Sequence, residues 1–262
     1  MARREVLYKH AIVRRPGENF AEGLTSIKGS PADYKKALEQ HEAYCAALER
    51  CGVEVVRLEA DLAHPDSTFV EDVAVLTRDS AILTRPGAKS REGEVDGIRE
   101  PLGKFFQAIH EISAPGRLDG GDICEAGTHF FIGVSRRTNE EGAKQLAAFL
   151  ARDGYTTSFV DIRAMKSILH LKSGIAYVGD GKLVVMEELA GREEFRGYEL
   201  IRVARDESYA ANCVRVNGYI LIPAGFPKIA RELIAQGFRV LELEVSEFQK
   251  MDGGLSCLSL RF

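Results

Sequence analysis

The chain has 262 residues, of which 45% are hydrophobic and 28% charged, and its formal net charge is −4. This composition is typical of a soluble globular protein with a full core, and the charge gives no basic surface for nucleic acid. The sequence contains no run of about 18 apolar residues, so we expect no membrane-spanning helix. Five cysteines without a CxxC pair predict reduced thiols in the cytoplasm and exclude the usual zinc-finger spacing.

The N-terminal part of the chain predicts a strand, a helix and a second strand. Residues 7–14 alternate in polarity as a strand does, and a helix opens at Ser30-Pro31, where serine suits the cap and proline the first turn. Residues 53–58 form the next predicted strand. One face of the helix carries the residues that we expect to be buried: Tyr34, Leu38, His41, Cys45 and Leu48.

The middle of the chain predicts a repeated hairpin. Four pairs of short apolar strands flank tight turns, and they cover residues 74–84, 123–133, 174–186 and 212–223. Asn217-Gly218 in the last pair is the strongest hairpin signal. Predicted helices follow three of the hairpins, over 94–109, 139–151 and 227–236, and a final strand covers 238–243.

The C-terminal residues 258–262 form a short predicted strand that can pair with residues 7–14. This pairing would complete a fifth strand–strand–helix–strand unit from the two ends of the chain. Five such units predict a ring of blades around a pseudo-fivefold axis, folded as a single domain over residues 1–262. The alternative is an ordinary mixed α/β sheet in which the hairpins are alike by accident.

Cys257 follows the glycine pair Gly253-Gly254 and stands at the start of the last predicted strand. Glycines allow unusual backbone torsions and close contact with a ligand, so the pair can aim the side chain that follows it. A lone cysteine is more often part of the core than a nucleophile. A catalytic role therefore requires a histidine and carboxylates in similar positions.

Three acids, Asp66, Glu71 and Asp72, lie around Phe69 and Val70 immediately before a predicted strand. The apolar pair should draw the acids inward, where charged carboxylates need partners. Fixed carboxylates suit a cationic substrate such as a guanidinium, which presents paired planar donors. The plainer interpretation is a solvated acidic loop.

Asp119 and His170 also precede predicted strand starts, as Asp72 and Cys257 do. In a ring of blades these four residues would converge at one end of the central channel. Asp119 can then bind one imidazole nitrogen of His170 and fix its tautomer. The other histidines that we weighed fit a helix face or strands and receive no role: His10, His41 and His129.

Arg91 and Arg137 occupy equivalent points after the first two hairpins. Most such arginines are simply solvated charges. A pair at this end of the ring could instead hold a substrate carboxylate in forked geometry. Acids at one end of the site and arginines at the other describe an amino-acid-like substrate with a basic side chain.

Five motifs, in order along the chain, together resemble the dimethylarginine dimethylaminohydrolase family of the guanidino-group-modifying (amidinotransferase, or pentein) superfamily: Phe69-Val-Glu-Asp72, Leu118-Asp-Gly-Gly-Asp122, His170-Leu-Lys-Ser173, Ala210-Ala-Asn-Cys213 and Asp252-Gly-Gly-Leu-Ser-Cys257. The resemblance implies a five-bladed α/β propeller. It also implies hydrolysis of Nω-methylated arginines, asymmetric dimethylarginine and monomethylarginine, to citrulline and dimethylamine or methylamine. The reaction would pass through a covalent cysteine thiouronium, without metal or organic cofactor.

The resemblance assigns roles position by position. Cys257 becomes the nucleophile, His170 the acid–base group and Asp119 its orienting partner. The implied substrate-binding residues are Asp72 and Asp66 for the guanidinium with Glu71 beside them, Arg91 and Arg137 for the α-carboxylate, Leu24 on a mobile lid, and Phe69, Met251 and Asp252. Two positions depart from the family pattern. Asp119 is a glutamate in some relatives, which can change its reach, and Gly253-Gly254 gives the cysteine loop less bulk.

Three other functions stay open at this point. The nearest is an arginine deiminase or arginine dihydrolase, which would use the same chemistry on unmethylated arginine. An amidinotransferase is disfavoured because no insertion is present to hold an acceptor amine, and a non-catalytic ring-shaped binding protein is disfavoured by the intact cysteine, histidine and acid set. We expect a small-molecule substrate, and the pattern allows either a monomer or a homodimer.

Overall fold

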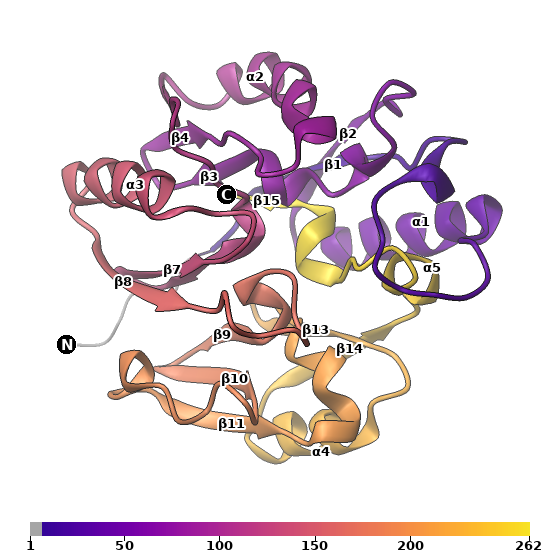
Figure 1. Cartoon of the computed structure of the whole chain (residues 1–262). Coiled ribbons are helices and arrows are strands. Elements are labelled where there is room, and N and C mark those ends of the chain that lie inside the picture. Colours follow the sequence, from indigo (N-terminus) through magenta and orange to yellow (C-terminus); the bar gives the residue numbers. More distant parts are fainter. Residues whose placement is uncertain (1–6) are drawn as a thin grey trace.

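The computed structural model describes residues 7–262, whose strands form five separate three-stranded sheets arranged in a ring (Figure 1). In every sheet the first strand is antiparallel to the second, and the second is parallel to the third. We call each sheet a blade and name it by its first strand. The blades are β3 (Ala74–Leu76), β4 (Ser80–Leu83) and β5 (Ala108–Glu111); β6 (Ile123–Ala126), β7 (His129–Val134) and β8 (Thr156–Asp161); β9 (Ile175–Gly179), β10 (Lys182–Met186) and β11 (Glu199–Val203); β12 (Val214–Val216), β13 (Tyr219–Pro223) and β14 (Arg239–Leu243); and β15 (Leu260–Arg261), β1 (His10–Arg14) and β2 (Glu54–Leu58).

The fifth blade is built from both ends of the chain. β15 pairs antiparallel with β1, with Leu260 opposite Ile12, and the amide of Phe262 donates to the carbonyl of His10 at 3.0 Å. The predicted closure of the ring is therefore confirmed, and the alternative of one mixed sheet is wrong.

Helices lie at the periphery of the ring and connect the second strand of a blade to the third (Figure 1). Parallel neighbours need a long crossover connection, which explains the helix in each unit. The α-helices are α1 (Tyr34–Arg50), α2 (Asp96–Gly103), α3 (Glu140–Arg152) and α4 (Pro227–Ala235), with the short α5 (Ser246–Gln249) leading into the C-terminal segment. In the β9 blade, 3-10 turns that include η7 (Glu193–Phe195) replace the helix, so the predicted unit is wrong there.

Two helix predictions differ from the structure in their bounds. The helix predicted over 94–109 ends at Gly103, and residues 108–111 instead form β5. Pro101 lies inside α2 and limits its continuation. α1 begins at Tyr34 and is capped by Asp33, whose carboxylate accepts from the amide of Lys36 at 3.1 Å. The cap is thus Asp33 and not the predicted Ser30. Both residue types are good caps, so the sequence alone did not distinguish them.

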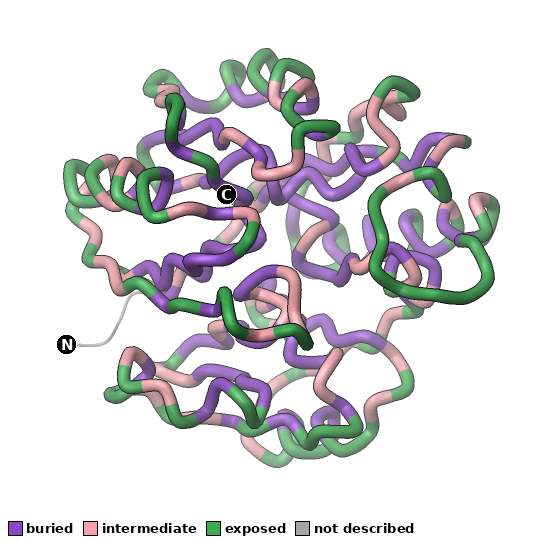
Figure 2. Tube along the Cα trace, in the orientation of Figure 1, coloured by how far each residue is buried: buried purple, intermediate pink, exposed green. Residues whose placement is uncertain are grey.

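A 3-10 helix precedes each of the five first strands: η3 (Val70–Val73), η5 (Gly120–Asp122), η6 (Leu171–Ser173), η8 (Arg205–Ala211) and η9 (Leu255–Leu258). Four contacts join them in a row, η9 to η3, η3 to η5, η5 to η6 and η6 to η8. The chain is buried along the turns and the middle strands and exposed at the periphery (Figure 2). The short turns therefore gather residues from all five blades at one place.

All five cysteines are free thiols, as the odd count and spacing predict. Among the helices of residues 7–262, none has the length and apolar content that crossing a membrane requires.

Candidate active site

The gathered turns enclose a small cavity of about 20 Å³, which is room for a single water molecule. Ten of the twelve residues predicted for the site line this cavity, and Asp119 and Glu71 do not. The lining residues are Leu24, Asp66, Phe69, Asp72, Arg91, Arg137, Leu169, His170, Met251, Asp252, Gly253 and Cys257. We call this cavity the catalytic pocket.

His170 stands at the start of η6 and contacts Asp119, which stands at the start of η5. Nε2 of His170 lies 3.0 Å from Oδ2 of Asp119, and the other oxygen of this fully buried acid accepts from the amide of Gly87 at 2.6 Å. Burial lowers the pKa of the imidazole, but Asp72, the hydrogen bond to Asp119 and the charge of Asp122 raise it to about 9. His170 is therefore an imidazolium at neutral pH, ready to donate a proton.

Asp72 lies on η3 beside the same imidazole. Its carboxylate accepts from the amide of Gly121 at 2.9 Å and from Arg91 at 2.5 Å. Burial raises the pKa of this carboxyl, but His170 and Arg91 outweigh burial and lower it to about 2. Gly121 has no room for a side chain, since a Cβ would lie 2.8 Å from both Asp72 Oδ1 and His170 Nδ1.

Cys257 lies on η9, and its amide donates to the carbonyl of Gly254 at 3.2 Å. It is the one cysteine that is not fully buried. Burial and the charges of Glu71 and Asp72 raise the pKa of its thiol to about 12. The thiol is therefore neutral at pH 7, and a cation bound beside it favours the thiolate.

Residues 23–31, which we call the lid segment, form a largely exposed loop before α1 (Figures 1 and 2), and Leu24 of this segment lines the pocket. The amide of Leu24 donates to both carboxylate oxygens of Asp66, at 3.0 and 3.2 Å. Asp252 binds the next part of the lid, because it accepts from the amide of Ser26 at 2.5 Å and from its hydroxyl at 3.0 Å. Both acids thus fix the lid segment beside the pocket.

The two predicted carboxylate-binding arginines have different surroundings. Arg91 is buried, and its guanidinium donates to Glu94 at 2.9 and 2.7 Å in addition to Asp72. Nη1 of Arg137 lies 3.5 Å from Asp119 and has no hydrogen-bond partner in the described part of the chain. Arg137 consequently has a free donor group for a substrate carboxylate, whereas the guanidinium of Arg91 already donates to two carboxylates.

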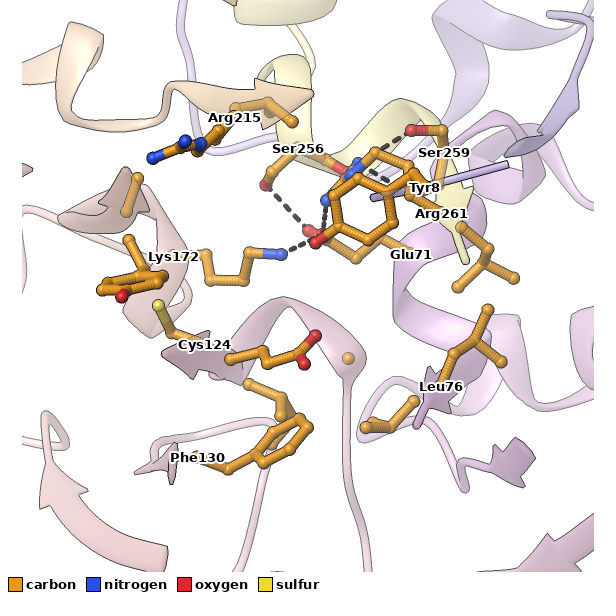
Figure 3. A pocket seen from close by; sticks show the side chains of 18 of the residues that line it. Tyr8, Glu71, Leu76, Cys124, Phe130, Lys172, Arg215, Ser256, Ser259 and Arg261 are labelled. Carbon is orange, nitrogen blue, oxygen red and sulfur yellow. Dashed lines mark hydrogen bonds and ion pairs between the residues drawn. The ribbon is translucent and has the colours of Figure 1, made fainter. Parts of the chain in front are cut away.

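Glu71 points away from the catalytic pocket, although Asp72 lines it. Its carboxylate binds Lys172 and accepts from the Ser256 hydroxyl at 2.8 Å, with Arg261 at 3.7 Å. Figure 3 shows these contacts at a second cavity of about 110 Å³, which the first strands of all five blades surround. We call it the axial cavity. The structure therefore does not bring the Glu71 carboxylate to the place that a substrate-binding role requires.

Asp122 and Leu169 take part in the site, and neither was singled out for a role from the sequence. Asp122 is fully buried and accepts from the hydroxyls of Thr138 and Ser135 at 2.6 and 2.7 Å and from the amide of Leu171 at 3.0 Å. It fixes the turn that carries His170. The Gly-Gly-Asp motif was the available signal, but a turn-forming acid and a buried acceptor have the same sequence pattern.

Asp72, Asp119 and His170 each bring one ligand atom within 4.8 Å of the others, which is a spacing that a metal ion accepts. Each atom also has a partner within the protein. Arg91 and Gly121 occupy the Asp72 oxygens, while His170 and Gly87 occupy those of Asp119. The arrangement is complete as a hydrogen-bonded acid–base set.

Comparisons with known proteins identify the family of this chain. The family model described as N,N dimethylarginine dimethylhydrolase, eukaryotic, matches residues 28–259. The N(G),N(G)-dimethylarginine dimethylaminohydrolase of Pseudomonas aeruginosa is 44% identical over 98% of this chain and 100% of its own length. The protein of the same name from Streptomyces coelicolor is 34% identical over 97% of this chain and 96% of its own.

Solved structures show the same fold. A cysteine-to-serine variant of the P. aeruginosa enzyme in complex with citrulline has a TM-score of 0.95, with 43% identity over 98% of this chain and 100% of that chain. The N-terminal domain of a cyanobacterial arginine dihydrolase has a TM-score of 0.87 at 18% identity, over 96% of this chain and 97% of that one, and shares the fold alone. With a matching family model over most of its length and a full-length relative at 44% identity, this chain belongs to the dimethylarginine dimethylaminohydrolase family of hydrolases.

Proposed function

We propose that this protein hydrolyses Nω-methylated arginines to citrulline and dimethylamine or methylamine. The observation that carries the proposal is the shared pocket of Cys257, Asp72 and an imidazolium at His170 that Asp119 supports. Membership of the family points to the same reaction, and its P. aeruginosa member has been solved with citrulline.

The first half of the reaction forms a covalent intermediate. Asp72 and Asp66 hold the guanidinium, which keeps its central carbon electrophilic. The bound cation lowers the pKa of the Cys257 thiol, which releases its proton to solvent. The sulfur of the resulting thiolate attacks that carbon and forms a C–S bond. His170 gives its proton to the departing nitrogen, the C–N bond breaks, and dimethylamine or methylamine leaves.

The second half regenerates the enzyme. Neutral His170 takes a proton from water, and the resulting hydroxide attacks the carbon of the thiouronium. The C–S bond then breaks, and the hydroxyl proton of the adduct passes to the departing sulfur and restores the Cys257 thiol. Citrulline is released, and His170 again carries its proton. Asp119 acts through His170 by holding one ring nitrogen, and Arg137 would bind the α-carboxylate of the substrate.

The proposal treats residues 1–262 as one domain, because its site residues come from the β3, β6, β9 and β15 blades together. The partner is a small molecule. A cytoplasmic location and the choice between monomer and homodimer stay predictions from the sequence.

The test is to incubate the purified protein separately with asymmetric dimethylarginine, arginine and agmatine, and to assay citrulline, dimethylamine, ornithine and ammonia. We expect citrulline and dimethylamine in equal amounts from the methylated substrate, and nearly complete loss of turnover in Cys257→Ser and His170→Gly. Faster release of ammonia from arginine would instead make the protein an arginine deiminase or dihydrolase. Wild-type rates in either variant would overturn the catalytic assignments.

A further inference from the structure

The turn before β12 is the one of the five to which the reaction assigns no residue. Asp72, Asp119, His170 and Cys257 come from the turns before β3, β6, β9 and β15. Asn212 follows the 3-10 turn before β12, and its relative exposure is 5%. Its motif, Ala210-Ala-Asn-Cys213, is part of the family resemblance without having a role in the chemistry.

The side chain of Asn212 joins the histidine turn to the cysteine turn. Its amide nitrogen donates to the backbone carbonyl of Lys172 at 3.1 Å, two residues beyond His170. Its oxygen accepts from the backbone amide of Ser256 at 2.9 Å, the residue before Cys257. One amide group thus fixes two backbone segments, each next to a reacting side chain.

The same side chain belongs to a closed set of contacts beneath the pocket. Nδ2 of Asn212 also donates to the hydroxyl of Ser256 at 3.1 Å, which in turn donates to Glu71 at 2.8 Å. Glu71 binds the ammonium group of Lys172 (Figure 3 shows the contacts of Glu71), and the backbone carbonyl of Lys172 accepts from Asn212, which completes the set. The set therefore connects the neighbours of His170, Cys257 and Asp72.

The space around Asn212 leaves this side chain little freedom. A Cβ at Gly254 would lie 2.6 Å from Cγ of Asn212 and 2.7 Å from its oxygen. The glycine pair before Cys257 thus allows the cysteine loop to approach the amide closely. This is a use of Gly254 other than aiming the cysteine directly.

We propose that Asn212 is a positioning residue for the reaction: it holds the Cys257 turn against the His170 turn and so sets the placement of the nucleophile relative to the acid–base group. Displacing a reacting group by about 1 Å costs on the order of 100-fold in rate. The hydrogen bonds of Asn212 go to Lys172 and Ser256 and not to the groups that bind substrate, Asp72, Asp66 and Arg137. The inference rests on the proposed function, which names the reaction. The expected changes in kcat and KM are the same whichever guanidine is the substrate.

The experiment compares wild type with Asn212→Ala on whichever guanidine the wild type turns over. We expect kcat to fall about 100-fold while KM stays within about threefold, because the lost contacts place the reacting groups and leave the binding groups unchanged. Asn212→Asp keeps the acceptor for Ser256 and loses the donor to Lys172, so kcat should stay low. Ser256→Ala keeps the backbone contact and should lose less.

Asn217→Ala is the matched control. Asn217 lies in the same blade and binds the backbone of Tyr8 and Cys51, away from the pocket. Both variants should melt at lower temperatures than wild type, but Asn217→Ala should keep the wild-type kcat when assayed well below its melting temperature.

A wild-type kcat in folded Asn212→Ala, or an equal loss of kcat in the control, would show that Asn212 only stabilises the fold. If Asn212→Ala does not fold, Ser256→Ala and Asn212→Asp decide by the same split between kcat and KM. Failure of the proposed function is distinguishable, because it would appear as a different wild-type product in the substrate assay.

Discussion

Nε2 of His170 lies 3.0 Å from Oδ2 of Asp119, although the two residues are 51 positions apart in the sequence. They begin the turns η6 and η5, which precede the first strands of neighbouring blades. The hydrogen bond therefore exists only where two blades pack together. The acid–base group is a property of the assembled ring and not of a single repeat.

Replacing Asp119 by asparagine should lower the pKa of His170. Asp119 holds the imidazolium by a hydrogen bond and by its charge, so its neutral analogue moves the titration midpoint down from about 9. Turnover at pH 7 should fall on the order of 10- to 100-fold, since the correct orientation and protonation of the acid are both weakened. NMR titration of the His170 ring and the rate of product formation measure the two effects.

Asp153→Asn is the control for this change, because its carboxylate binds Thr77 and Ser80 and does not line the pocket. It should leave both readouts unchanged. An Asp119→Asn protein with the wild-type midpoint for His170 would contradict the prediction.

The thiol of Cys257 should react slowly at neutral pH in the ligand-free protein. Because its pKa is raised to about 12, alkylation by iodoacetamide should accelerate about tenfold per pH unit from pH 7 to 10. Asp72→Asn removes one of the charges that raise this pKa and should speed the reaction at a given pH. Cys257→Ser gives the background from the buried thiols, and a plateau below pH 8 would argue against the raised pKa.

Arg137 should contribute to binding mainly through the α-carboxylate of the substrate. Nη1 of this residue lies 3.5 Å from Asp119 and has no hydrogen-bond partner among residues 7–262, so a substrate carboxylate can accept from it without displacing a hydrogen bond. Arg137→Ala should raise KM for carboxylate-bearing guanidines about tenfold or more, since hydrogen bonds to charged groups are worth about 1.5–3 kcal/mol. Steady-state kinetics measure it, and an unchanged preference for these substrates over agmatine would count against the role.

The ring could be predicted from the sequence because its signals are local. Turn signals such as Asn217-Gly218 define hairpins within a few residues, and four such hairpins leave the fifth unit to be closed by pairing between residues 7–14 and 258–262. The helix predicted over 94–109 was too long, because the strand at 108–111 pairs with residues far from it in sequence and has no local mark.

The directions of neighbouring side chains could not be predicted. Glu71 and Asp72 are adjacent in sequence, yet Glu71 faces the axial cavity while Asp72 lines the catalytic pocket. In a single 3-10 turn, successive side chains point about 120° apart, and only packing decides which one meets the substrate. The contacts of Arg91 with Glu94 also depend on packing. The sequence pattern therefore predicted Arg91 as a substrate-binding residue without revealing these contacts.

Asp252→Ala should open the lid more often. The carboxylate of Asp252 accepts from both the amide and the hydroxyl of Ser26. Because the pocket has only about 20 Å³ of space, we expect the lid segment to move before an arginine-sized substrate enters. Amide exchange at residues 24–27 should become faster. KM should rise several-fold, because the closed complex is weakened. Asp61→Ala is the control, since Asp61 binds Ala63 and His64 outside the lid segment. Equal amide exchange in both variants would show that the contacts of Asp252 with Ser26 do not hold the lid segment.

Gly120→Ala should destabilise the protein and abolish most activity. A Cβ at this position would lie 1.9 Å from the carbonyl oxygen of Glu71, so the turns that carry Asp119 and Asp72 would be forced apart. Overpacking of this kind costs about 1–3 kcal/mol. Gly191→Ala is the matched control, because its Cβ would meet nothing within 4 Å, and it should change stability by less than about 0.5 kcal/mol. Urea unfolding compares the two, and equal midpoints would mean that the η3 and η5 turns tolerate separation without loss of stability.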